Sequence, residues 1–179
     1  VRDMTQKELR DKLGYVPQKG VLFSGTIDSN IRYGKPEITD AQVKEAAEVA
    51  QATEFIDTKP EKYESPVSQG GTNVSGGQKQ RLSIARAIAK EPEIFIFDDS
   101  FSALDFKTDS QLRKALKEYT KDATTVIVAQ RISTILGADQ IIVLDDGHMA
   151  GIGTHKELMA NCEVYQQIAR SQLSEEELA

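Results

Sequence analysis

Two adjacent carboxylates, Asp98 and Asp99, follow a short apolar run and are well suited to hold a metal ion. The run Ile94–Phe97 lacks the alternation of a half-exposed strand, which predicts a strand buried on both faces of a parallel sheet. Ligands bind beyond the carboxyl ends of such strands. A solvated acidic turn is the alternative, but two carboxylates placed there repel each other unless they share a cation. We therefore predict that Asp98 holds Mg²⁺, directly or through water, with Asp99 one residue nearer the open site.

A serine, two glycines and a glutamine form a second pattern, one that suits phosphate. Ser75 and Gln78 have the spacing of a capping box, in which side chains satisfy the free N–H groups of a helix's first turn. Gly76 and Gly77 remove Cβ atoms where another group must approach the backbone closely. A helix N-terminus with bare N–H groups attracts an anion such as phosphate. An ordinary glycine-rich loop before a helix remains an open alternative for these four residues alone.

Taken together, five segments resemble the motifs of the ATP-binding-cassette (ABC) ATPases. They occur in the family's order with family-like spacing and cover about residues 13 to 134. The closest subgroup looks like the nucleotide-binding domain of an ABC exporter, on the cues Phe23–Ile27, Asn30-Ile31 and Ser68–Gly71. The matching segments are Val16–Gln18 (Q-loop), Asn73–Arg81 (signature, with Val74 for the usual Leu), Ile94–Asp98 (Walker B), Ser102–Asp105 (D-loop) and Ala129–Arg131 (switch-histidine segment).

The resemblance implies roles for particular residues, with ATP and Mg²⁺ as cofactors. In the family, the Q-loop glutamine reaches the Mg²⁺ and the attacking water, and it couples the site to the transmembrane domain; taken alone, Gln18 reads as an ordinary loop amide. The implied assignments are catalysis for Asp99, Gln130 and Gln18, ATP binding for Ser75, Gly76, Gly77, Gln78 and Asp105, and metal binding for Asp98 and Gln18.

Two of these positions depart from the family. The general base is usually Glu, whereas this chain has the shorter Asp99, and a misplacement of about 1 Å can cost roughly a hundredfold in rate. The switch residue is usually His, whereas Gln130 cannot accept a proton near neutral pH as an imidazole can. In the family's head-to-tail dimer, each ATP lies between one subunit's Walker B and the other's signature. The sequence therefore resembles the degenerate half of a heterodimeric exporter, with a slow site of its own and a signature that serves its partner.

No G-x-x-x-x-G-K-[ST] loop, the loop that cradles nucleotide phosphates, occurs in the sequence. In the family this loop lies upstream of the Q-loop. Since the chain also begins with Val1 rather than Met, we expect a C-terminal portion of a nucleotide-binding domain. We expect the parent protein to be an ATP hydrolase, and this portion alone to bind ATP poorly and not to hydrolyse it.

The elements around these motifs predict an α/β fold, because strands alternate with helices along the chain. The resemblance implies a partial P-loop-NTPase (RecA-like) core with a mainly parallel sheet and an inserted α-helical subdomain. Residues 1–179 would form one partial ABC ATPase domain, with the helical subdomain at about 20–85 and the core remnant and C-terminal helices at 1–19 and 86–179. Strands are expected at 13–16, 94–97, 123–129 and 140–144. The strand at 123–129 is expected to be buried, and the strand at 140–144 leads through a turn at Asp145–Gly147 into a hairpin. Helices are expected after Thr5, Thr39, Ser75 and Thr154, at 102–119 and at 163–173.

Composition limits the classes of function. The formal net charge of -6 argues against a nucleic-acid partner, and a lone Cys162 rules out an internal disulfide. There is no apolar run long enough for a membrane helix, and residues 174–177 predict a solvated acidic tail. We expect a soluble portion of a protein at the cytoplasmic face of the cell membrane, partnered by a transmembrane domain and a second nucleotide-binding domain. A soluble ABC ATPase of the DNA-repair or translation type and a non-catalytic dimerisation or regulatory module are the alternatives.

Overall fold

The structure, a computed structural model, describes residues 2–174, and this part of the chain forms two compact units. The first unit ends at Val128 and the second begins at Ala129. Of the predicted acidic tail, only Ser174 lies within the described residues. Over the described range, none of the helices is both long enough and apolar enough to cross a lipid bilayer.

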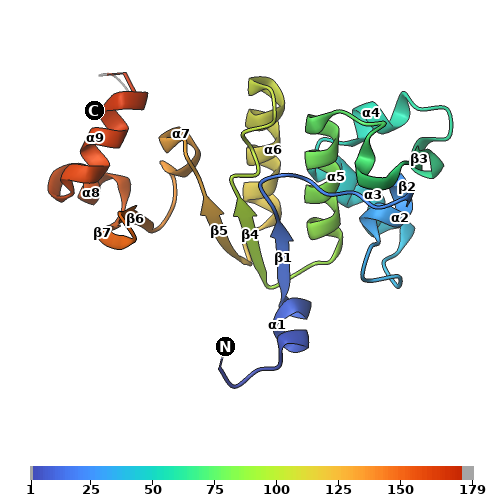
Figure 1. Ribbon diagram of the computed structural model, residues 1–179, viewed down its shortest axis with the longest axis horizontal. Helices are drawn as coiled ribbons and strands as arrows, with labels where there is room; N and C mark the ends of the chain where they lie inside the picture. The colour runs from blue at the N-terminus through green and yellow to red at the C-terminus, as the bar shows by residue number, and fades with distance from the viewer. Residues whose placement is uncertain (1, 175–179) are drawn as a thin grey trace. The chain divides into compact units, whose positions relative to one another are not determined.

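A three-stranded parallel sheet lies at the centre of the first unit (Figure 1). Its strands are β1 (Leu13–Val16), β4 (Ile94–Asp98) and β5 (Thr124–Val128), in the order β1-β4-β5. Because all three strands run in the same direction, their carboxyl ends meet at one edge of the sheet. The parallel sheet predicted from the sequence is present.

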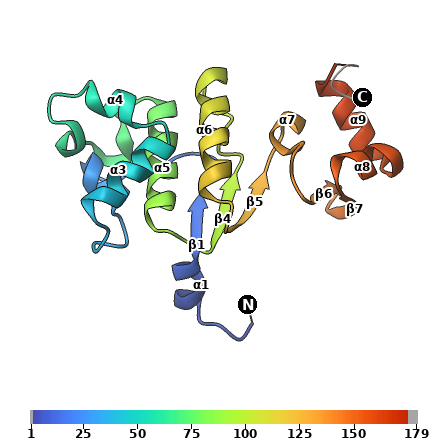
Figure 2. The ribbon, with the colours of Figure 1, turned by 180° about the vertical axis from the view of Figure 1, so that it is seen from behind.

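Helices α2 to α5 gather on one side of this sheet, as Figure 1 shows and Figure 2 shows from behind. A two-stranded antiparallel sheet joins β2 (Gly25–Thr26) to β3 (Pro66–Val67). The helical elements of this unit are α1 (Gln6–Lys12), α2 (Ile27–Ile31), α3 (Asp40–Val49), α4 (Thr53–Asp57), η1 (Lys62–Glu64), η2 (Gln69–Gly71), α5 (Gly76–Ala89) and α6 (Phe106–Tyr119).

Local side-chain chemistry starts several of these helices at the predicted residues. Thr5, Thr39 and Ser75 cap α1, α3 and α5, and each forms a complete capping box with the side chain three residues later. The prediction that a helix begins at Ser102 is wrong, because α6 starts at Phe106. The preceding residues form a turn instead, and the Asp105 side chain accepts the hydrogen bond that caps α6.

Helix α5 is the element on which the first unit packs. Its apolar residues Leu82, Ile84 and Ile88 are fully buried. Its basic residues reach the backbone of three distant segments, so the helix fixes those segments by hydrogen bonds as well as by apolar contact. These bonds run from Arg81 to the Gln51 carbonyl (2.7 Å), from Arg86 to the Asn30 carbonyl (2.8 Å) and from Lys90 to the Leu13 carbonyl (3.0 Å).

The strands are less buried than the sequence predicted. In β4 only Phe95 and Phe97 are buried, while Ile94 and Ile96 are half-buried. In β5, predicted to be a buried strand, only Ile127 is even partly buried. The prediction of strands buried on both faces is therefore wrong.

One-sided packing explains this exposure. Helix α6 covers one face of the sheet, where Tyr119 lies edge-on to Phe95 with 6.5 Å between ring centroids. On the other face Tyr15, Val126 and Val128 are 53%, 46% and 52% exposed, and β5 is an edge strand of this sheet.

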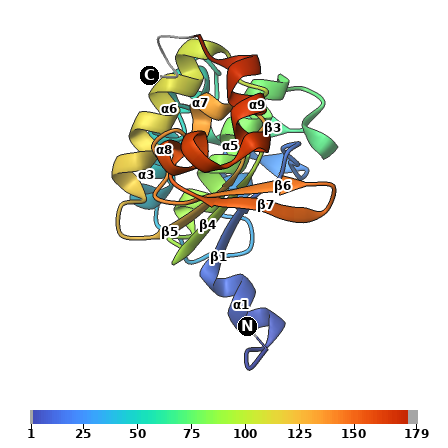
Figure 3. The ribbon, with the colours of Figure 1, turned by 90° about the vertical axis from the view of Figure 1, so that its left-hand side faces the viewer.

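The second unit is built on an antiparallel hairpin of β6 (Ile141–Asp145) and β7 (His148–Gly153), shown in Figure 3. Asp146 and Gly147 both have positive φ, at 47° and 80°, as a tight two-residue hairpin turn requires. This hairpin was predicted from the sequence. Helices α7 (Ile132–Ile135), α8 (His155–Asn161) and α9 (Glu163–Gln172) complete the unit.

Candidate functional site

The carboxyl ends of β1 and β4 bring together residues that lie about 80 positions apart in the sequence. Val16 lies opposite Phe97, so the residues that follow each strand become neighbours. The Gln18 side chain donates a hydrogen bond from Nε2 to Asp99 Oδ2 at 3.1 Å. The Tyr15 hydroxyl donates to Asp98 Oδ2, also at 3.1 Å. Gln18, Asp98 and Asp99 thus lie at one edge of the sheet.

Asp99 has a constrained backbone. Its φ of 44° lies in the left-handed region, which is uncommon for a residue with a Cβ, although Asp tolerates it better than most. The Asp99 N–H donates to the Val128 carbonyl at 2.9 Å, and the Ser102 hydroxyl donates to the Asp99 carbonyl at 3.0 Å. Such conformations persist where the surroundings hold them, often at functional sites. The backbone therefore sets the direction of the Asp99 carboxylate.

Ser75 and Gln78 close the first turn of α5 as a capping box. The Gln78 N–H donates to Ser75 Oγ at 3.2 Å, and the Ser75 N–H donates to Gln78 Oε1 at 3.1 Å. A Cβ added at Gly76 would meet nothing within 4 Å, and one at Gly77 would lie 3.6 Å from the Ala103 carbonyl oxygen. Packing within the chain therefore demands neither glycine, and an incoming group has room to reach the backbone.

Asp105 has a structural role in this chain. Its Oδ1 accepts a hydrogen bond from the Thr108 N–H at 2.9 Å, and its Oδ2 accepts one from the Thr108 hydroxyl at 2.6 Å. These two bonds lower the pKa of the Asp105 carboxyl. Both carboxylate oxygens are thus engaged in capping α6, and the role of Asp105 toward ATP stays a prediction.

Gln130 belongs to the second unit, where its side chain is exposed. Gln172, at the end of α9, grips the backbone on either side of Arg131. Its Nε2 donates to the Gln130 carbonyl and its Oε1 accepts from the Ile132 N–H, both at 2.9 Å. A distant helix therefore fixes the backbone of the segment that carries the predicted switch residue.

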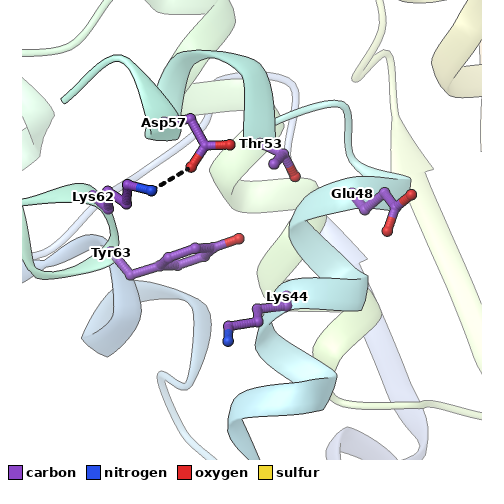
Figure 4. A pocket seen from close by; sticks show the side chains of 6 residues that line it. All are labelled: Lys44, Glu48, Thr53, Asp57, Lys62 and Tyr63. Atoms are coloured by element: carbon purple, nitrogen blue, oxygen red, sulfur yellow. Dashed lines mark ion pairs between the residues drawn. The ribbon is translucent and has the colours of Figure 1, made fainter.

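A separate hollow of about 340 Å³ lies on α3, α4 and η1 (Figure 4). It contains no residue of the predicted site. Its lining mixes charges of both signs, including an ion pair between Lys62 and Asp57 at 3.6 Å. The lining residues are Lys44, Glu48, Thr53, Asp57, Lys62 and Tyr63.

Comparison with known proteins gives the family. The sequence profile described as "ABC transporter" matches residues 1–102, more than half of the chain. The chain belongs to the ABC transporter family. The resemblance predicted from the five motifs is thereby confirmed.

Relatives within the ABC transporter family are longer than this chain. An uncharacterized ABC transporter ATP-binding protein of Mycobacterium tuberculosis is 46% identical over 175 residues, which are 96% of this chain and 30% of that protein. A second, from Bacillus subtilis, is 44% identical over 98% of this chain and 30% of its own length. A Staphylococcus aureus protein, provisionally named a multidrug export ATP-binding/permease protein, is 45% identical over 94% of this chain and 29% of its length. This chain therefore spans about 30% of these relatives.

A solved structure of a bacterial Atm1-family ABC exporter with ATP bound has a similar fold. The TM-score is 0.92 at 39% identity, and the match covers 98% of this chain and 31% of that one. This similarity confirms the predicted α/β class, with a partial P-loop-NTPase core and a mainly parallel sheet.

The residues present fit part of an Mg²⁺ site in an ABC protein. Carboxylate and amide oxygens are ligands that Mg²⁺ accepts, and Asp98, Asp99 and Gln18 lie at the same edge of the sheet. No cluster of three or more His, Cys, Asp or Glu suited to a metal occurs within residues 2–174. Mg²⁺ usually keeps several waters and binds substrate phosphates, so a site with few protein ligands suits this ion.

Three residues at these segments were missed by the sequence analysis. Tyr15, which donates to Asp98, lies in a strand pattern that carries no sign of a polar partner. Partial burial and the neighbouring Asp98 carboxylate raise the pKa of the Tyr15 hydroxyl. Gln80 and Gln172 act through backbone hydrogen bonds to segments 60 and 42 residues away, which no local pattern signals.

Proposed function

We propose that this chain is the portion of an ABC exporter's nucleotide-binding domain that carries the Q-loop, signature, Walker B and D-loop. In the parent protein it binds Mg²⁺ and ATP and contributes to the hydrolysis that powers export across a membrane. The observation that carries this proposal is the hydrogen bond from Gln18 to Asp99 at the carboxyl edge of the sheet. Sequence relatives and a structural neighbour with export in their names support it.

Each residue at the sheet edge then has a task. Mg²⁺, when bound, supplies positive charge that stabilises the phosphate oxygens during transfer. Asp98 and the Gln18 amide oxygen offer ligands to it. Asp99 accepts a proton from the attacking water, and Gln18 Nε2 holds the Asp99 carboxylate in place. By resemblance to the family, Gln130 of the second unit would donate a hydrogen bond to the terminal phosphate.

We propose that the two sites of the dimer are unequal. Asp99 is one methylene shorter than the family's Glu, and Gln130 lacks the imidazole of the usual His, so this chain's own site turns over slowly. Its signature keeps the cap and the open glycines, so it can complete the partner's site. The partner is a second, different nucleotide-binding domain in a head-to-tail arrangement.

An exposed aromatic pair offers a surface to the transmembrane domain. Phe23 and Tyr33 stack with 4.0 Å between ring centroids, and they are 39% and 55% exposed. The Arg86 guanidinium lies 5.3 Å and 5.6 Å from these two rings. The pair lies within residues 20–85, the proposed helical subdomain, at the cytoplasmic face of the membrane. Neighbouring Val21 is also exposed, so the surface can bury apolar area against a short helix.

The open face of the sheet supports a role within a longer protein. Tyr15, Val126 and Val128 form an apolar surface that an upstream segment would cover. The relatives extend well beyond the matched region. We propose that such a segment supplies the phosphate-binding loop that is absent from this sequence.

Calorimetric titration of Mg-ATP into this chain, and into the protein extended upstream through a phosphate-binding loop, tests the proposal. We expect binding to the extended protein, loss of that binding by at least tenfold in Asp98→Asn, and little binding to the short chain. If the extended protein binds no nucleotide, the chain is a signature donor or a non-catalytic module. Tight binding by the short chain would mean that other residues hold the phosphates.

A further inference from the structure

Gln80 is a buried polar side chain that the proposed reaction does not use directly. It lies one turn into α5 and is 1% exposed. A buried amide costs free energy unless its donor and acceptor are both hydrogen-bonded. The partners of Gln80 therefore show what its burial accomplishes.

Both partners of Gln80 are backbone groups of the segment 17–20, which contains Gln18 and is called the Q-loop segment below. Gln80 Oε1 accepts a hydrogen bond from the Gly20 N–H at 2.8 Å. Gln80 Nε2 donates to the Pro17 carbonyl at 3.0 Å. The two contacted residues flank Gln18 and Lys19, so one side chain grips the loop on both sides of the residue that contacts Asp99.

Close packing at Gly20 is an independent sign that the loop is pressed onto α5. A Cβ at Gly20 would lie 2.8 Å from Ser83 Oγ and 2.9 Å from the Lys79 carbonyl oxygen, closer than real Cβ atoms approach. The Lys79 backbone cannot move without moving the helix. Only glycine therefore lets the Gly20 N–H reach Gln80.

We propose that Gln80 is a positioning residue that fixes the Q-loop segment to the signature helix and thereby holds Gln18 against Asp99. This inference rests on the proposed function for its catalytic consequence. Gln80 lies two residues after Gln78, so the helix that completes the partner's site also holds the Q-loop segment of this chain's own site. A displacement of α5 at one site then moves Gln18 at the other.

Two variants test this inference by disrupting the hydrogen bonds between Gln80 and the loop, one from the helix and one from the loop. Gln80→Met keeps the length of the side chain and removes both hydrogen bonds. Gly20→Ala keeps Gln80 but forces the loop away from α5. Gln166→Met is the matched control, because Gln166 also donates to a backbone carbonyl, that of Met159 at 2.9 Å, in the second unit. Gln80→Asn, which is too short to span both partners, replaces Gln80→Met if that variant does not fold.

Hydrogen exchange of the amide at position 20, which donates to Gln80, is the first readout in the full-length protein. We expect this amide to exchange at least about tenfold faster in Gln80→Met and in Gly20→Ala, and to be unchanged in Gln166→Met. The variant that carries both Gln80→Met and Gly20→Ala should exchange little faster than either single variant, since each substitution removes the same contact between Gln80 and the loop. Unchanged exchange in the single variants, or fully additive effects, would overturn the inference.

ATP hydrolysis is the second readout, with each substitution placed in a Gly76→Asp background. A carboxylate at position 76 repels phosphate at the partner's site, so the turnover that remains comes from this chain's own site. We expect kcat to fall by about tenfold or more with KM little changed, because Gln18 is misplaced while the ATP-binding residues are intact. A normal kcat alongside faster exchange would refute the positioning role. If the unmodified protein hydrolyses no ATP, the proposed function and the catalytic consequence of Gln80 both fail, and the exchange result still decides whether Gln80 fixes the loop.

Discussion

At the scale of single residues, Asp99 is the most constrained residue of the candidate site. Its backbone is left-handed, its N–H is bonded to β5 and its carboxylate is held by Gln18. These contacts place the carboxylate with little freedom to compensate for its short side chain. We therefore propose that the length of the Asp99 side chain limits the rate of hydrolysis at this site.

We predict that Asp99→Glu raises the turnover of this chain's own ATP site by about tenfold or more, because the added methylene carries the carboxylate toward the water. The measurement is steady-state ATP hydrolysis by the full-length transporter. A Gly76→Asp background silences the other site, since a carboxylate there repels phosphate. Asp122→Glu, at an exposed position, is the control. An unchanged rate would place the limit at Gln130 instead.

At the scale of elements, the contact between α6 and the sheet predicts a pH dependence of stability. Burial, together with the charges of Glu91 and Glu45, raises the pKa of Tyr119 to about 12, above its ordinary value of about 10. A raised pKa means that the folded state holds the proton more tightly than the unfolded state. The resulting stabilisation is complete below about pH 10 and is lost as the pH rises through about 12.

Tyr119→Phe tests this dependence. We expect its free energy of unfolding to fall less steeply than that of the unmodified chain between about pH 10 and 12, and the difference between the two to be constant below pH 10. Urea denaturation at a series of pH values measures both. Parallel curves across the whole range would show that Tyr119 ionises equally in the folded and unfolded states.

Elements set by nearby side chains were predictable from the sequence, and elements set by distant contacts were not. The capping boxes at Thr5, Thr39 and Ser75 are local, so the starts of those helices were predicted correctly. Strand β2 was missed, because it exists only through pairing with the distant strand β3. Helix α2 was missed although Thr26 and Ser29 form a local capping box, because a serine in place of the usual Glu or Gln carries no clear signal. The burial of β5 was overestimated, because an apolar sequence cannot show which of its faces the chain covers.

The candidate site likewise contains residues that the sequence predicted and residues that it did not. The positions of Gln18, Asp98 and Asp99 followed from strand ends and from a family resemblance, and the structure brings the three to one edge of the sheet. The residues that hold these segments in place could not be predicted from the sequence. Gln80 and Gln172 are glutamines in helices, and only the folded chain shows that their amides hold the Pro17–Gly20 and Gln130–Ile132 segments.

At the scale of the whole molecule, the chain spans about 30% of the length of its ABC transporter relatives, and we propose that it is one part of a longer protein. We propose that the two ATP sites are unequal, so that the signature of this chain contributes more to turnover than its own Asp99 carboxylate does. Gly76 offers a clean test, because a side chain there meets nothing within 4 Å. An aspartate at a helix N-terminus also favours the helix, so the fold should tolerate it.

The most direct measurement compares ATP hydrolysis by the full-length transporter carrying Gly76→Asp with that of the transporter carrying Asp99→Asn. Thermal unfolding of both variants serves as the check on folding. The account predicts that Gly76→Asp removes most of the turnover, by about tenfold or more, while Asp99→Asn leaves most of it. The reverse result, with Asp99→Asn abolishing turnover and Gly76→Asp leaving it intact, would contradict the account.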